Sequence, residues 1–175
     1  MSERIAFALV WIAIVAQRLF ELRLSARHEA ALAARGGYEV SGSRLGPIAL
    51  AHALWLALWA WEVLALGSRP PAAWPALAAI ALAAEALRWW AIASLGPRWT
   101  ARVFALPGQP LVKAGPYRWV AHPNYLAVAI EILVLPLAFG AWRAALAGLA
   151  LYLVTLSLRW SAERRARGLA SLRDA

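Results

Sequence analysis

Five apolar stretches, each near 20 residues long, alternate with polar segments along the chain. A helix of about 20 apolar residues crosses the roughly 30 Å hydrocarbon core of a bilayer. Backbone groups in lipid must be paired within their own segment, so an all-α, polytopic membrane fold is predicted, as one domain over residues 1–175. The predicted transmembrane helices are residues 5–24, 46–66, 74–95, 123–139 and 144–160, the last continuing into a basic tail.

Arginine and lysine predict how these helices are oriented, because cytoplasmic segments carry an excess of positive charge. The segments 23–44 and 96–122 and the C-terminal tail hold 13 basic residues, whereas the alternate ends hold only Arg4, Arg69 and Arg143. Five crossings put the three rich segments on one side, which predicts an N-terminus outside and a C-terminus inside. Tryptophans near helix ends are expected to form an interfacial belt; these are Trp74, Trp99, Trp119, Trp142 and Trp160.

Composition excludes an ordinary soluble domain. Hydrophobic residues make up 63% of the chain and charged residues 15%, against roughly 45–50% and 25% in globular proteins. The net charge of +9 is distributed between apolar runs, which favours contact with anionic lipid headgroups over nucleic acid. The absence of cysteine excludes thiolate metal sites, and no metal site is predicted. The Ala/Arg/Leu-rich composition suggests a bacterial inner-membrane protein, and nothing in it indicates an oligomeric state.

Charged residues inside the predicted helices need partners, because a charge at the bilayer centre costs about 2.5–3.5 kcal/mol. Arg18 with Glu21, and Glu85 with Arg88, stand three residues apart on helix faces and are expected to form ion pairs. His52 is expected to be a hydrogen-bonded packing residue. Whether these five polar residues are structural or functional stays open on sequence grounds.

Two further glutamates lie in predicted helices. Glu131 has no basic residue near it in sequence, so its partner must come from another helix, the long connection or a ligand. Glu62 stands near the outer interface, where solvation is expected to be sufficient.

The most informative segment precedes the fourth helix and reads Gly115-Pro116-Tyr117-Arg118-Trp119-Val120-Ala121-His122-Pro123-Asn124-Tyr125-Leu126. Gly115-Pro116 predicts a turn, and Pro123 suits the first turn of a helix. His122 is therefore expected at the cytoplasmic mouth of that helix, where free amides attract a carboxylate. The rings of Tyr117, Trp119 and Tyr125 are expected around the same mouth, where aromatic faces attract a cation such as a sulfonium.

This motif resembles the signature of the isoprenylcysteine carboxyl methyltransferase family, Gly-Pro-Tyr-Arg-x-x-x-His-Pro-x-Tyr followed by an intramembrane glutamate. Arg159 and Glu163 similarly resemble the family's Arg-x-x-x-Glu at the cytoplasmic end of the last helix. The resemblance implies S-adenosylmethionine as cofactor and a lipophilic substrate in a membrane protein. It implies a cofactor-binding set and a catalytic set; these are Tyr117, His122, Pro123, Tyr125, Glu131 and Glu163 for the first, and Arg159, Glu163 and His122 for the second.

The first half resembles a bacterial branch linked to methylation of alkylpyrone-type polyketide lipids, through residues 18–22, Ser25, Arg27, 36–39 and His52. Two positions depart from the wider family pattern: Ala121 stands where many members have arginine, and Arg164 where many have a second glutamate. These departures argue against a prenylated protein as substrate.

Methyl transfer to a carboxylate needs only positioning, which the resemblance assigns to Arg159, whereas an acidic enol or phenol also needs a base, for which His122 and Glu163 are candidates. Two other classes remain open. His122-Pro123-Asn124-Tyr125 is related to the hallmark of NADPH-dependent sterol-type reductases, and the intramembrane charges fit a non-catalytic haem or assembly protein.

Overall fold

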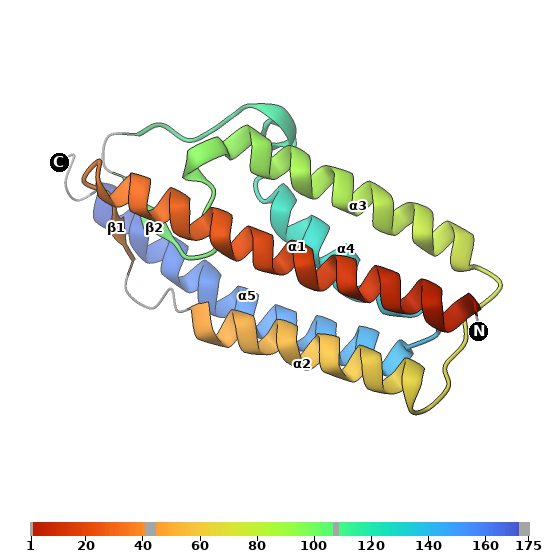
Figure 1. The fold of residues 1–175 in the computed structure, drawn as a ribbon. Helices are drawn as coiled ribbons and strands as arrows, with labels where there is room; N and C mark the ends of the chain where they lie inside the picture. The colour runs from red at the N-terminus through yellow and green to blue at the C-terminus, as the bar shows by residue number, and fades with distance from the viewer. Residues whose placement is uncertain (1, 41–44, 107–108, 172–175) are drawn as a thin grey trace.

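The computed structural model describes residues 2–40, 45–106 and 109–171, with side chains described from Glu3 to Ser161 within those ranges. Five long helices run along one common direction (Figure 1). They are α1 (Ser2–Ala33), α2 (Leu45–Leu64), α3 (Trp74–Leu95), α4 (Pro123–Ala138) and α5 (Trp142–Ser171). Smaller elements are the strands β1 (Tyr38–Glu39) and β2 (Phe104–Ala105) and the 3-10 turns Gly96–Arg98 and Gly115–Arg118.

The five-helix prediction is confirmed, with one large difference in length. Trp74–Leu95 forms a helix with the predicted bounds, and the other helix starts lie within a few residues of expectation. The first helix was predicted to end at residue 24, but α1 continues to Ala33. The polar residues of its last turns bind the α3–α4 connection, so the helix extends beyond its apolar part.

Four helices, α1, α2, α3 and the first part of α5, are long and apolar enough to cross a membrane within the described residues. The 16 residues of α4 are fewer, and at 1.5 Å per residue they reach about 24 Å. Pro136 lies inside α4, which ends two residues later. A fifth crossing by α4 therefore stays a prediction.

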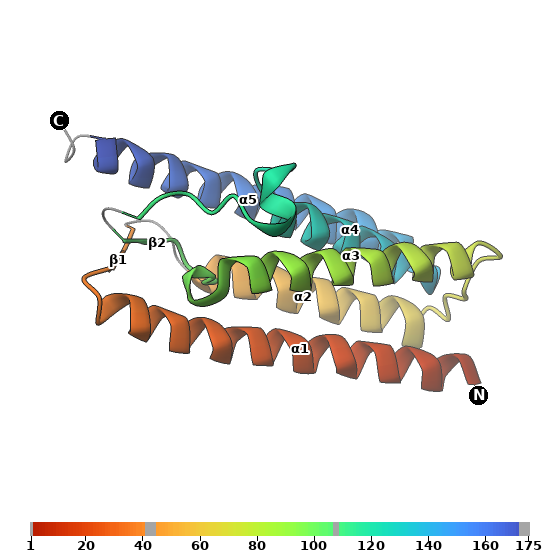
Figure 2. The same ribbon diagram turned by 90° about the horizontal axis from the view of Figure 1, so that it is seen from above.

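Different segments of the chain lie at the two ends of the helix bundle (Figures 1 and 2). The N-terminus lies with the α2–α3 and α4–α5 links at one end, whereas the β1–β2 pair, the α3–α4 connection and the end of α5 lie at the other. Gly140 of the α4–α5 link approaches Arg69 of the α2–α3 link so closely that a Cβ would stand 2.1 Å from the Arg69 carbonyl oxygen. The three basic segments thus share one end, as their alternation predicts.

Tryptophan packing at the α2–α5 contact fixes how closely these helices approach. Trp55 is fully buried, stacks on Trp59 with ring centroids 5.6 Å apart, and donates a hydrogen bond to the Ile132 carbonyl of α4 at 3.2 Å. A Cβ at Gly148 of α5 would stand 2.2 Å from the Trp55 ring. Glycine at 148 therefore allows the two helices to pack.

Glu62 corrects the expectation of a solvated side chain. Its carboxylate is fully buried and accepts hydrogen bonds from the backbone amides of Arg143 at 3.2 Å and Ala144 at 2.8 Å. These amides open α5, where a negative charge is favourable against the helix dipole. Glu62 therefore caps α5 from α2.

We expect Gly148→Ala to destabilise the protein by about 1–3 kcal/mol, because overpacking displaces a hydrogen-bonded tryptophan. Gly46→Ala is the matched control, since a Cβ at Gly46 of α2 meets nothing within 4 Å. Thermal unfolding in detergent should show a lower melting temperature for Gly148→Ala alone. Equal melting temperatures for the two variants would contradict the close α2–α5 contact.

The predicted orientation is testable because the chain has no cysteine. Single cysteines placed by Ala72→Cys, in the exposed α2–α3 link, and Ser161→Cys, exposed on α5, report opposite ends of the bundle. In intact bacterial cells an impermeant maleimide should label Ala72→Cys, and should label Ser161→Cys only after the membrane is opened. The reverse pattern would place the basic end outside.

Candidate functional site

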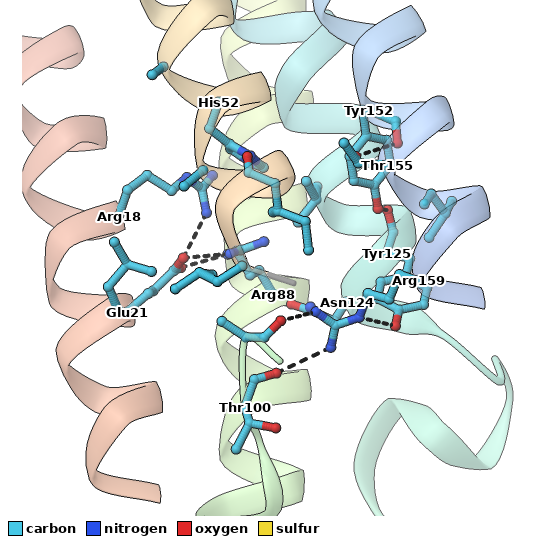
Figure 3. A pocket seen from close by; sticks show the side chains of 18 of the residues that line it. Arg18, Glu21, His52, Arg88, Thr100, Asn124, Tyr125, Tyr152, Thr155 and Arg159 are labelled. Carbon is cyan, nitrogen blue, oxygen red and sulfur yellow. Dashed lines mark hydrogen bonds and ion pairs between the residues drawn. The ribbon is translucent and has the colours of Figure 1, made fainter. Parts of the chain in front are cut away.

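Two neighbouring cavities lie between the helices and the α3–α4 connection. The first, the polar cavity, has a volume of about 510 Å³ at the basic end, beneath the connection. The second, the apolar cavity, has a volume of about 240 Å³ between the helices (Figure 3). Five residues line both of them, namely Trp99, Thr100, Asn124, Tyr125 and Arg159. The cavities therefore meet at these five side chains.

Backbone turns shape the wall of the polar cavity. Gly115 has φ +57°, and a Cβ there would stand 2.0 Å from Ser94 Oγ of α3, so glycine lets the connection lie against α3. The 3-10 turn Gly115–Arg118 follows, as predicted, and the chain then reaches His122, the N-cap of α4. The His122 side chain makes no capping hydrogen bond to this helix.

Four of the predicted site residues line the polar cavity: Tyr117, His122, Tyr125 and Arg159. The imidazole of His122 stacks on the Tyr125 ring, with centroids 5.1 Å apart and an interplanar angle of 8°. His122 also lies 6.2 Å from the Trp160 ring. The motif before α4 and the end of α5 are thus brought together.

Arg159 connects α5 to α4 and to the connection. Its Nε donates to Tyr125 Oη at 2.5 Å, its Nη2 to the Thr100 carbonyl at 3.2 Å, and its Nη1 to the Ala101 carbonyl. The guanidinium carbon lies 5.3 Å from the Tyr125 ring centroid. These contacts hold its positive charge at the junction of the two cavities (Figure 3).

Asn124 was not predicted as a site residue, although it lies within the motif. Its Oδ1 atom is buried without a hydrogen-bond partner in the described part of the chain, and its side chain lines both cavities. Buried polar atoms are nearly always paired, so this oxygen is suited to a donor from a ligand or water. Only the motif position could have signalled it from sequence.

The last turns of α1 bind the α3–α4 connection, which covers the polar cavity. Ser25 Oγ accepts a hydrogen bond from the Ala101 amide at 2.8 Å and donates to Glu29 at 2.7 Å. Arg102 pairs with Glu29 and, at 2.7 Å, with Glu39 of β1. The connection is therefore fastened to the N-terminal third of the chain.

The apolar cavity reaches the surface between α1 and α2. Its lining includes the exposed side chains of Leu19 and Leu22 from α1 and of Ala49 and Ala53 from α2. His52 lines it as well, and its Nδ1 lies 2.9 Å from the Ile48 carbonyl oxygen within α2. The hydrogen bond predicted for His52 is confirmed.

Buried ion pairs close the α1–α3–α4 side of this cavity. Glu21 pairs with Arg18 at 2.9 Å, as predicted, and also with Arg88 of α3 at 2.6 Å. Arg18 pairs in turn with Glu131 of α4 at 2.5 Å, which supplies the interhelical partner expected for Glu131.

The predicted Glu85–Arg88 pair is wrong. Glu85 instead accepts a hydrogen bond from Gln17 of α1 at 2.5 Å, while Arg88 binds Glu21. Contacts between helices have replaced the contact within one helix.

Pro123 and Glu131, both predicted to belong to the site, do not line either cavity. Pro123 is buried in the first turn of α4. Glu163 lies in α5, outside the residues whose side chains are described.

Two tryptophan predictions are wrong. Trp119, expected at the mouth of α4, is 66% exposed and packs outside against Trp90 of α3 at 5.7 Å. Trp99, expected in the interfacial belt, is buried and lines both cavities.

Two bacterial proteins are similar to this chain over most of its length. An uncharacterized protein of Bacillus subtilis (strain 168), YpbQ, is 34% identical over 160 residues, which cover 91% of this chain and 95% of the relative. An uncharacterized protein of Haemophilus influenzae is 28% identical over 158 residues, covering 87% and 90%. No solved structure gave a significant match.

The model of the isoprenylcysteine carboxyl methyltransferase (ICMT) family matches residues 77–167. That range contains most of α3, the connection, all of α4 and most of α5. It therefore includes every lining residue of the polar cavity and all five residues shared by the two cavities. The chain is an integral membrane protein that belongs to the isoprenylcysteine carboxyl methyltransferase family of membrane methyltransferases.

Proposed function

We propose that this protein transfers a methyl group from S-adenosylmethionine to a carboxylate or acidic hydroxyl of a lipophilic substrate. The reaction takes place at the cytoplasmic face of the bacterial inner membrane. One observation carries the proposal: a polar cavity at the basic end and an apolar cavity between the helices share Arg159, Tyr125 and Asn124. A polar cofactor in the first cavity and a lipophilic substrate in the second meet where the two cavities join.

The polar cavity suits S-adenosylmethionine in size and in chemistry. Its 510 Å³ lies within the usual range of about 300–1,000 Å³ for ligand sites. Arg98 and Lys113 on its lining offer positive charge to a carboxylate. The buried Oδ1 of Asn124 offers an acceptor to an ammonium or adenine amino group.

The bound cofactor would supply an electrophilic methyl group on a sulfonium. The residues of this chain hold the reactants in line, because displacement needs the attacking atom about 3–3.5 Å from the methyl carbon. Tyr117 and the stacked pair His122 and Tyr125 line the polar cavity on the side of the α3–α4 connection. Their aromatic faces would favour the positive charge of the sulfonium. No covalent enzyme intermediate is needed.

The apolar cavity receives the acceptor through its opening between α1 and α2. A carboxylate acceptor is already anionic, and Arg159 positions it at the junction. An enol or phenol has to lose a proton, and His122, on the polar cavity, or Glu163, one turn beyond Arg159 on α5, accepts it. Membrane lipids are the medium from which such a substrate enters.

Pro123 and Glu131 act behind the cavity walls in this proposal. Pro123 fixes the first turn of α4, which carries His122 and Asn124 at its start. Glu131 holds Arg18, whose side chain lines the apolar cavity. Both residues therefore act through neighbours that face the ligands.

Calorimetric titration of the purified protein should show binding of S-adenosylmethionine and none of NADPH. His122→Ala should weaken this binding about tenfold or more, as loss of stacking and polar contact is worth about 1.4 kcal/mol. Trp119→Ala is the control, because that ring lies outside both cavities. Binding of NADPH in place of S-adenosylmethionine would instead support a reductase.

Arg159→Ala should lower methyl transfer about a hundredfold, as misplacement of a reactant by 1 Å does, while affinity for S-adenosylmethionine changes about threefold or less. Turnover is measured as label passing from S-adenosylmethionine into extracted membrane lipids, with product identified by its added methyl mass. Arg159→Lys tests charge without the fork, and Arg143→Ala, at the opposite end, is the control. A loss confined to cofactor affinity would move Arg159 from the acceptor to the cofactor.

A further inference from the structure

Arg88 lines the apolar cavity and has a buried nitrogen without a hydrogen-bond partner among the described residues, as Arg18 has at Nε. The Arg88 side chain is only 6% exposed. Nε and Nη2 donate to the two carboxylate oxygens of Glu21 at 2.7 and 2.6 Å. The remaining nitrogen, Nη1, is buried and has no hydrogen-bond partner in the described part of the chain.

An unpaired donor at this place is unusual, since a buried polar group without a partner costs free energy. Other acidic groups are close in the fold: Glu131 pairs with Arg18 through Oε2, its Oε1 being buried without a partner among the described residues, and Glu85 accepts from Gln17. Glu21 fixes one edge of the guanidinium fork, which leaves the other edge in a set direction. Figure 3 shows Arg88 reaching from α3 into the space between Glu21 of α1 and the residues of α4 and α5.

We propose that Arg88 determines acceptor specificity by donating from Nη1 to an oxygen of the acceptor's head group. This inference rests on the proposed function and specifies its substrate class. The acceptor is an amphiphile whose apolar tail leaves between α1 and α2 and whose head carries at least two oxygen atoms. Arg88 binds the oxygen that is not methylated, and the oxygen to be methylated turns toward Arg159.

The charge of the cavity supports an anionic or carbonyl head. Arg18, Arg88 and Arg159 all line it, and Glu21 is its only acidic lining residue in the part of the chain that the structure describes. A cationic head would lie against these guanidinium groups in a low dielectric, where repulsion is strong. We therefore expect lipids with a quaternary ammonium head to bind in this cavity more weakly than lipids with an anionic head.

The test measures binding of radiolabelled decanoate to the full-length protein in lipid nanodiscs, without S-adenosylmethionine, with empty discs subtracted. Arg88→Lys keeps a cation for Glu21 but removes the second edge of the fork. We expect decanoate to bind about tenfold more weakly to this variant, the equivalent of about 1.4 kcal/mol. Arg143→Lys is the matched control, because Arg143 also faces a buried glutamate, Glu62, but lies outside the cavity.

Unchanged decanoate affinity in folded Arg88→Lys would overturn the proposal, and would leave Nη1 to an ordered water. A second measurement needs no variant: decanoate should compete for the wild-type site at least tenfold better than decyltrimethylammonium, and equal competition would also overturn it. Neither measurement uses the cofactor. The proposed function is refuted separately if the wild-type protein does not bind S-adenosylmethionine.

Discussion

The carboxylate of Glu21 is the contact on which the arrangement of the helices depends. It binds Arg18 on its own helix and Arg88 on α3, and Arg18 continues to Glu131 on α4. In lipid each of these charges would cost about 2.5–3.5 kcal/mol if left alone, and removal of one partner leaves another charge buried. The network therefore admits few alternatives: α1 must lie where Glu21 reaches α3 and Arg18 reaches α4. The apolar cavity is the space left beside this fixed corner.

Much of the fold follows from sequence because lipid imposes a simple rule on helix length and charge. Trp74–Leu95 was predicted with its observed bounds, since proline precedes it and Gly96 ends it. The end of α1 was missed by nine residues because Glu29 and Ser25 are stabilised by Arg102 and Ala101, more than seventy residues away. No local pattern reports such a contact. Glu62 was misjudged for a similar reason, because its partners are backbone amides that open α5.

The site, like the fold, contains residues that could be predicted from sequence and residues that could not. Tyr117, His122 and Tyr125 are near neighbours in one motif, so their common location could be predicted, and a family resemblance added Arg159. Thr100, Trp99 and the orphaned oxygen of Asn124 carry no distinctive pattern, and only the fold places them on both cavities. Glu85 and Arg88 are three residues apart on α3, as the sequence indicates, but Arg88 binds Glu21 of α1 instead. Bidentate contact with Glu21 gives Arg88 two charge-assisted bonds, which a neighbour on the same helix did not supply.

The two cavities take their lining residues from different parts of the chain. Every described residue that lines the polar cavity lies within the family match, 77–167. The apolar cavity takes about half its lining from α1 and α2, which precede that match. Both bacterial relatives align over about nine-tenths of this chain, so the α1–α2 half belongs to the shared protein. In the proposed function, the polar cavity is the donor site and a separate helix pair supplies part of the acceptor wall, an arrangement in which the acceptor can change while the donor chemistry stays. Glu21 joins the two parts, because this α1 side chain lines the apolar cavity and also orients Arg88 from the matched region.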